Sequence, residues 1–156
     1  MIHIISGAPC SGKTTYIEQH KNKNDIVIDT DKLAKALGAE SDHKADAAIY
    51  KAALDAREII INNIQKYNAD NVWIIDTRPC QENILKYNSM DADFITLDPG
   101  KEVCLERAKE RPEGTAEDIE DYYNRKEVVF HKEKNGLMML LDRLNTQLNH
   151  SNNSQI

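Results

Sequence analysis

The sequence predicts an α/β fold in which a parallel sheet of four to five strands carries helices on both faces. Short apolar runs rich in isoleucine alternate with helical stretches along the chain, and this alternation is typical of βαβ units. The expected strands cover residues 1–5, 25–29, 72–76 and 93–97. Because parallel strands end together at one edge of the sheet, we expect ligands to bind at that edge.

The stretches between these strands have the spacing of helices. The expected helices cover residues 13–20, 31–37, 42–67, 81–87, 99–111 and 115–130, with one more after Gly136. In the third of them, apolar residues recur at helical steps, and its alanine-rich first half is expected to pack closely on the sheet. Asp98 and Pro99 suit the N-cap and the first position of the helix that Pro112 ends.

Length and composition set limits on the class of protein. The 156 residues fit one domain, expected over residues 1–148, and the polar residues 149–156 are expected to form a disordered tail. A net charge of -6 argues against binding to long DNA, because such affinity comes mainly from Lys and Arg. Cys10, Cys80 and Cys104 lack the spacing of a disulfide framework or a zinc site. The sequence shows no signal peptide or membrane span, so we expect a cytoplasmic protein.

A phosphate-binding motif precedes the first helix. Residues 7–14 match G-x-x-x-x-G-K-[ST] between an apolar strand and a helix, where backbone N–H groups and the helix N-terminus can bind phosphates. The residues expected to bind ATP are Gly7, Ala8, Pro9, Cys10, Ser11, Gly12, Lys13, Thr14 and Thr15. We expect Lys13 to bridge the β- and γ-phosphates and the Thr14 hydroxyl to bind Mg²⁺. With this motif, the expected architecture is the three-layer P-loop NTPase fold.

Acidic residues follow the second and third expected strands. Asp31 is the preferred base for deprotonating an acceptor hydroxyl, and Asp29 is expected beside the acceptor. The alternative is that one of the two merely caps the helix that follows. Asp76 closes an apolar run and is expected to assist Mg²⁺, while Arg78 is expected to meet an acceptor phosphate or sugar.

Two arginines stand four residues apart before a Pro/Gly segment. Arg107 and Arg111 would then share one helix face, and residues 107–115 have the form of a short lid with Gly114 permitting closure. Both arginines are expected to stabilise charge on the transferred phosphoryl group. The alternative is a solvated face whose ion pairs involve Glu106, Lys109 and Glu110.

On these residues the sequence resembles small P-loop kinases, in particular polynucleotide 5′-hydroxyl kinases and zeta-toxin-like kinases, which are often short phage proteins. The resemblance spans residues 1–125. It rests on the loop through Thr15, the Asp-x-Asp after the second strand, Ile75-Asp76-Thr77-Arg78, and the segment from Leu97 to Arg107 followed by Arg111. It implies that Asp31 deprotonates the acceptor and that Arg107 and Arg111 are lid residues.

The function expected from the sequence is that of a kinase. It would transfer the γ-phosphoryl group of ATP, with Mg²⁺, to a nucleoside, a nucleotide or a nucleic-acid 5′ end. The expected partner is therefore a small-molecule or nucleic-acid-derived acceptor. No binding to a membrane is expected. The alternative is a regulatory NTPase that binds ATP without a phosphoryl acceptor.

Overall fold

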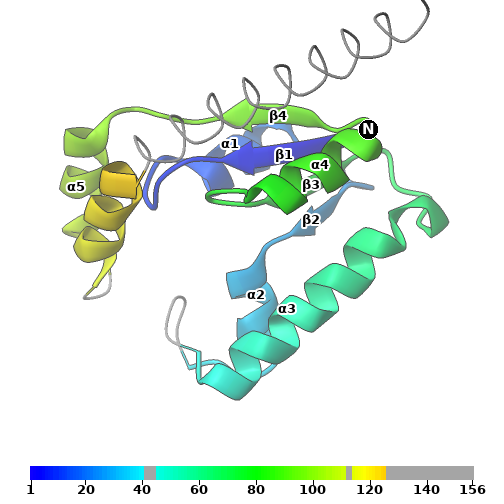
Figure 1. Ribbon diagram of the computed structural model, residues 1–156, viewed down its shortest axis with the longest axis horizontal. Helices are drawn as coiled ribbons and strands as arrows, with labels where there is room; N and C mark the ends of the chain where they lie inside the picture. Colours follow the sequence, from blue (N-terminus) through cyan, green and yellow to red (C-terminus); the bar gives the residue numbers. More distant parts are fainter. Residues whose placement is uncertain (41–44, 112–113, 126–156) are drawn as a thin grey trace, which may run out of the picture.

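The computed structural model describes residues 1–40, 45–111 and 114–125 (Figure 1). Within these residues, four parallel strands form one sheet in the order β2-β3-β1-β4. The strands are β1 (Ile2–Ser6), β2 (Ile26–Ile28), β3 (Val72–Ile75) and β4 (Asp93–Thr96). The central strand β1 aligns Ile2 with Val72 of β3 and His3 with Asp93 of β4. This arrangement confirms the predicted parallel sheet.

The helices follow the strands in alternation. They are α1 (Lys13–His20), α2 (Thr30–Ala36), α3 (Ala47–Asn62), α4 (Gln81–Ser89) and α5 (Lys101–Ala108), and residues 115–125 are also helical. The third expected helix is shorter than residues 42–67. Asn63 bonds through its backbone N–H to Ile60 O, three residues back, at 3.1 Å. The chain therefore tightens into the 3₁₀ helix η1 (Ile64–Lys66) after α3.

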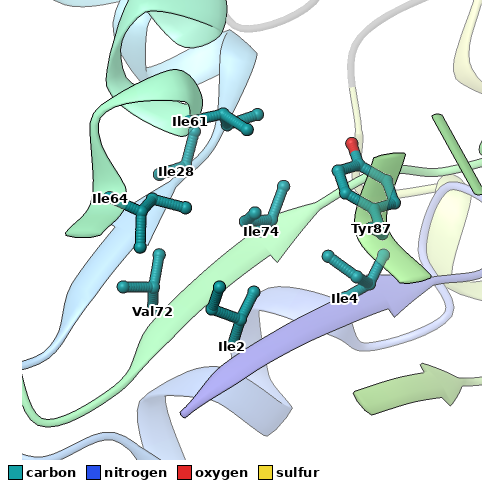
Figure 2. Close-up of a cluster of buried hydrophobic side chains, with 8 residues drawn as sticks. All are labelled: Ile2, Ile4, Ile28, Ile61, Ile64, Val72, Ile74 and Tyr87. Carbon is teal, nitrogen blue, oxygen red and sulfur yellow. The ribbon is translucent and has the colours of Figure 1, made fainter. Parts of the chain in front are cut away.

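Alternate side chains of each central strand enter two cores on opposite faces of the sheet. Ile5 and Trp73 pack with Ile17 of α1 on one face. On the other face, β1, β2 and β3 pack against α3, η1 and α4 (Figure 2), through Ile2, Ile4, Ile28, Ile61, Ile64, Val72, Ile74 and Tyr87. Because strand side chains alternate between faces, the isoleucine-rich runs supply both cores. The predicted three layers are confirmed.

The alanine-rich first half of α3 does not pack on the sheet as expected. Ala53 packs instead with Ala34 of α2 and with Ala39, together with Leu33 and Ile49. Small side chains let the two helices approach closely, so α2 and the first half of α3 lie together, away from the strands (Figure 1). Only the second half of α3 reaches the sheet, through Ile61.

The helix after β4 begins later than expected. Asp98 and Pro99 precede α5, and Gly100 is its N-cap, with φ of 97°. The carboxylate of Asp98 accepts hydrogen bonds from the Gly100 N–H at 3.3 Å and from the Tyr123 hydroxyl at 2.7 Å. Asp98 thus stabilises a turn before α5. It is not the N-cap of a helix that begins at Pro99, as the sequence predicted.

Several expectations lie outside the described residues. These are the helix after Gly136, the domain limit at residue 148 and the tail over residues 149–156. Among the described helices, none has the length and apolar character needed to cross a membrane.

Candidate active site

The loop over residues 7–12 is held by backbone contacts at the ends of three strands. Gly7 follows β1 with φ of 137°, and its N–H donates to Thr77 O, beyond the end of β3, at 3.2 Å. A Cβ at Gly7 would lie 2.3 Å from Leu97 O, just after β4. Gly12 caps α1 with φ of 101°, and Cys10 adopts φ of 61°. Only glycine fits position 7, since both its φ and the nearby carbonyl exclude a side chain.

The ammonium group of Lys13 already lies within this loop. Its Nζ donates to Gly7 O at 2.8 Å and to Ala8 O at 2.7 Å. Ser11 is buried, and its Oγ has no hydrogen-bond partner among the described residues. A phosphate group would offer anionic oxygens to the lysine in place of neutral carbonyl oxygens. The structure therefore places the Lys13 ammonium group inside the loop, and its role toward the β- and γ-phosphates stays a prediction.

The pKa of Lys13 is lowered from 10.5 to about 8, chiefly because burial disfavours the charged ammonium. The nearby Cys104, Cys10, Asp29 and Asp31 act in the opposite direction. Both carboxylates after β2 are therefore close enough to the loop to act on its lysine. Asp31 is half-buried in the first turn of α2.

Asp29 caps the helix that follows it, which was the alternative interpretation of the acidic residues after β2. It is the N-cap of α2, and its Oδ1 accepts a hydrogen bond from the Asp31 N–H at 3.0 Å. The cap fixes the backbone of Asp31 beside the end of β2. A role of Asp29 toward an acceptor stays a prediction.

Asp76 lies at the end of β3 inside a polar network that the sequence reasoning missed. Its Oδ2 accepts hydrogen bonds from the Tyr87 hydroxyl at 2.9 Å, Asn83 Nδ2 at 3.0 Å and Arg57 Nη2 at 3.4 Å. Arg57 Nη2 also donates to the Tyr87 hydroxyl at 2.8 Å. One signal was present in the sequence: Arg57 stands four residues after Ala53 on an otherwise apolar, buried helix face.

Asp76 and Thr14 each carry an oxygen of the kind that Mg²⁺ binds in proteins. No described residue donates a hydrogen bond to Asp76 Oδ1, and Thr14 is exposed at the start of α1. The described residues include no cluster of three or more His, Cys, Asp or Glu side chains suited to a metal. Mg²⁺ commonly uses one or two protein oxygens together with phosphates and water, so a carboxylate and a hydroxyl suffice.

Arg107 reaches the loop from α5. Its Nη1 donates to Cys10 O at 3.1 Å and would stand 3.8 Å from a Cβ at Gly12. Arg111 does not share its helix face, because α5 ends at Ala108 and the Arg111 N–H donates to Ala108 O across a turn, at 2.9 Å. The structure thus brings Arg107 to the phosphate loop and leaves Arg111 exposed beyond the helix.

The surface ion pair that formed the alternative is also present. Lys109 Nζ lies 2.5 Å from Glu106 Oε2, and both side chains are exposed. The Glu106–Lys109 ion pair and the contact of Arg107 with the loop are both present. A solvated face with ion pairs and an arginine directed at the loop are therefore compatible. A lid over residues 107–115 stays a prediction.

Arg78 is directed toward the helix at residues 115–125. Its guanidinium carbon stands 4.9 Å from the centre of the Tyr122 ring, and Nη2 donates to Asp121 O at 3.3 Å. Its Nε is buried without a hydrogen-bond partner among the described residues. These contacts link the end of β3 to this helix, and a role of Arg78 toward an acceptor stays a prediction.

An apolar cluster supports the loop from the side of α5. Ala8 packs with Cys104 and Ala108 of α5 and with Ile119 and Tyr122 of the following helix. No sequence pattern indicated this contact, because it joins residues about a hundred positions apart. The cluster fixes the helix that carries Arg107 against the loop.

The strand, loop and helix over residues 2–20, within a parallel sheet covered on both faces, define a P-loop nucleotide-binding domain. A family model described as an AAA domain matches residues 4–129, and the chain belongs to that family. It is also similar to a chain in the solved structure of the Pnkp1/Rnl/Hen1 RNA repair complex, with 19% identity and a TM-score of 0.65. That match covers 84% of this chain and 45% of the other. This chain therefore spans less than half the length of the chain in the RNA repair complex. No match was found among curated proteins.

Proposed function

We propose that the protein is an ATP-dependent P-loop kinase. It transfers the γ-phosphoryl group of ATP to a nucleoside, a nucleotide or a nucleic-acid 5′ end. The observation that carries the proposal is the position of Asp31 in the first turn of α2, just after β2, where its carboxylate, like that of Asp29, is close enough to the loop to act on the pKa of Lys13. A kinase needs a carboxylate of this kind near the phosphate it transfers, whereas a protein that only binds ATP does not.

The residues of the loop bind and orient the donor. The N-terminus of α1 and the loop N–H groups other than those bonded to Thr77 O and Ala8 O would face the phosphates, and Lys13 would neutralise their charge. Arg107, which already donates to Cys10 O, supplies a second cation beside the loop. Mg²⁺ held by Thr14 and Asp76 would screen charge between the β- and γ-phosphates.

Asp31 acts on the acceptor. Its carboxylate accepts the proton of the acceptor hydroxyl as the hydroxyl oxygen bonds to the γ-phosphorus. The bond from that phosphorus to the β–γ bridging oxygen breaks, and ADP leaves with the bond electrons. The capping bond from Asp29 holds the Asp31 backbone in place during this step.

Charge and the structural likeness support the proposed class of acceptor. A net charge of -6 favours a small acceptor or a strand end over a long duplex. The similarity to a chain of an RNA repair complex adds the 5′ end of RNA to the acceptors that deserve a test.

A screen for labelled phosphate transfer tests the proposal. Purified protein, Mg²⁺ and labelled ATP are incubated with nucleosides, nucleotides, and 5′-hydroxyl oligonucleotides of DNA and RNA, with Lys13→Ala as the blank. We expect transfer to at least one class, and Asp31→Asn should reduce it about 10²–10⁴-fold while leaving ATP affinity unchanged. Asp55→Asn, at an exposed ion pair with Lys51, is the matched control. ATP binding without transfer to any acceptor would instead identify the regulatory NTPase.

A further inference from the structure

The network around Asp76 treats the two oxygens of its carboxylate differently. The hydrogen bonds from Tyr87, Asn83 and Arg57 all reach Oδ2, whereas no described residue donates to Oδ1. A carboxylate with one oxygen saturated cannot rotate without losing these bonds. Oδ1 is therefore the oxygen left for another ligand.

Arg57 makes this network a charged one. Its side chain is 8% exposed and that of Asp76 is 12% exposed, so water screens the pair poorly. The second nitrogen, Nη1, lies 3.6 Å from Glu58 Oε1, and Glu58 Oε2 pairs with Lys86 Nζ of α4. Arg57 is thus held from α3 and α4 at once, which fixes the guanidinium against the end of β3.

The hydroxyl of Tyr87 has no part in the apolar core to which its ring belongs. The ring packs in the core beside Ile4, with the hydroxyl directed away from that residue (Figure 2). A phenylalanine would fill the same space. The hydroxyl accepts from Arg57 and donates to Asp76, so its contribution is to join these two groups.

Stability alone accounts poorly for such an arrangement. Taking a charged pair out of water costs free energy that its attraction often fails to offset, and apolar replacements of similar volume are often as stable. The network does orient a carboxylate, and outer partners of this kind typically change metal affinity 10–100-fold when they are lost.

We propose that Arg57 and Tyr87 are positioning residues that hold the Asp76 carboxylate with Oδ1 presented to the Mg²⁺ of the bound nucleotide. Asn83 fixes the same oxygen from α4. The inference rests on the proposed function, in which Asp76 assists the metal. It adds that α3 and α4, which contribute no residue to the phosphate loop, set the metal requirement of the site.

The test measures binding rather than transfer. A fluorescent ATP analogue is titrated at a series of Mg²⁺ concentrations and again in excess chelator, using wild type, Asp76→Asn, Tyr87→Phe, Arg57→Met and Arg57→Lys. Lys51→Ala, at the exposed pair with Asp55 on the same helix, is the control. Thermal unfolding of each variant is recorded in parallel. If Arg57→Met does not fold, Tyr87→Phe decides the question, because it keeps the buried ring.

We expect Tyr87→Phe and Arg57→Met to raise the half-saturating Mg²⁺ concentration about tenfold or more, with affinity in chelator unchanged. Arg57→Lys should rescue part of the loss, because it keeps the charge without the planar fork. A fall in melting temperature with an unchanged Mg²⁺ requirement would overturn the inference and leave the network purely structural.

The outcomes also distinguish the positioning role of Arg57 and Tyr87 from the metal role of Asp76. If Asp76→Asn raises the Mg²⁺ requirement and Tyr87→Phe does not, the positioning role fails while the metal role of Asp76 stands. If Asp76→Asn has no effect on the Mg²⁺ requirement, both fail. Transfer to an acceptor remains an independent measurement in either case.

Discussion

The phosphate loop and the α2–α3 pair are built in different ways. The loop is made of consecutive residues whose backbone is fixed on several sides, by Thr77 O, by Leu97 O and by the cluster beneath Ala8. The α2–α3 pair packs mainly on itself through alanines and exposes large apolar side chains, among them Leu37, Tyr50 and Leu54. The loop backbone is thus fixed by other elements, whereas α2 and the first half of α3 pack mainly on each other.

An alanine placed at one glycine of each region tests this difference and has the largest expected effect. Gly7 and Gly38 both have positive φ, of 137° and 107°, but a Cβ at Gly38 would have no neighbour within 4 Å. We expect Gly7→Ala to abolish nucleotide binding and to destabilise the fold by more than about 2 kcal/mol, since a backbone carbonyl must move. Gly38→Ala should cost about 1 kcal/mol through its φ alone. Chemical unfolding and a nucleotide titration measure both effects.

Equal losses from the two substitutions would contradict the comparison. They would mean that the loop tolerates displacement as readily as the end of α2 does.

A second prediction compares the two arginines after β4. Arg107→Ala should weaken nucleotide binding about 10–100-fold, because a charged donor beside the phosphates is lost. Arg111→Ala should change it less than about twofold, since Arg111 lies beyond the end of α5. Titration with a fluorescent ATP analogue gives both numbers. Similar losses for the two variants would show that both arginines close on the nucleotide, as the sequence predicted.

The third prediction concerns pH and has the smallest expected effect. The pKa of Lys13 is about 8 in the free protein, and bound phosphates should raise it. Binding above pH 8 then takes up a proton, so affinity should fall as pH rises, by at most about tenfold per unit. Calorimetry in two buffers of different ionisation enthalpy measures the proton uptake. Lys13→Met should bind weakly and show no such uptake.

The lowered pKa of Lys13 also predicts how the free energy of unfolding changes with pH. Folding disfavours the charged lysine, so the free protein is destabilised while Lys13 is protonated in both the folded and unfolded states, below pH 8. This penalty is relieved as pH rises from about 8 toward 10.5. A stability curve for wild type that runs parallel to that of Lys13→Met across this range would contradict the assignment.

The part of the fold and site that could be predicted is the part coded locally. The loop motif, its strand and its helix lie within residues 2–20, so their geometry follows from glycines and hydrophobic runs that are neighbours in the sequence. Strand positions followed from the same apolar runs, with limits correct to about one residue. Asp31 and Asp76 could be placed at strand ends because parallel strands end at a common edge.

The features that could not be predicted from the sequence depend on contacts between side chains far apart in the chain. Arg57, Tyr87 and Asp76 come from three elements, and nothing near any one of them identifies the other two. The start of α5 was misplaced for the same reason, because Asp98 is engaged by Tyr123 from a later helix. Arg111 was assigned to a helix face that ends before it, since no local residue marks the end of α5 at Ala108.

The strand order also has a consequence for synthesis. β1 is synthesised before both of its partners, β3 at Val72–Ile75 and β4 at Asp93–Thr96. A nascent chain emerging from the ribosome therefore exposes an isoleucine-rich strand with two unpaired edges until much of the domain has been translated. Such edges favour association between chains, so slowing translation before β3 should increase aggregation of the newly made protein.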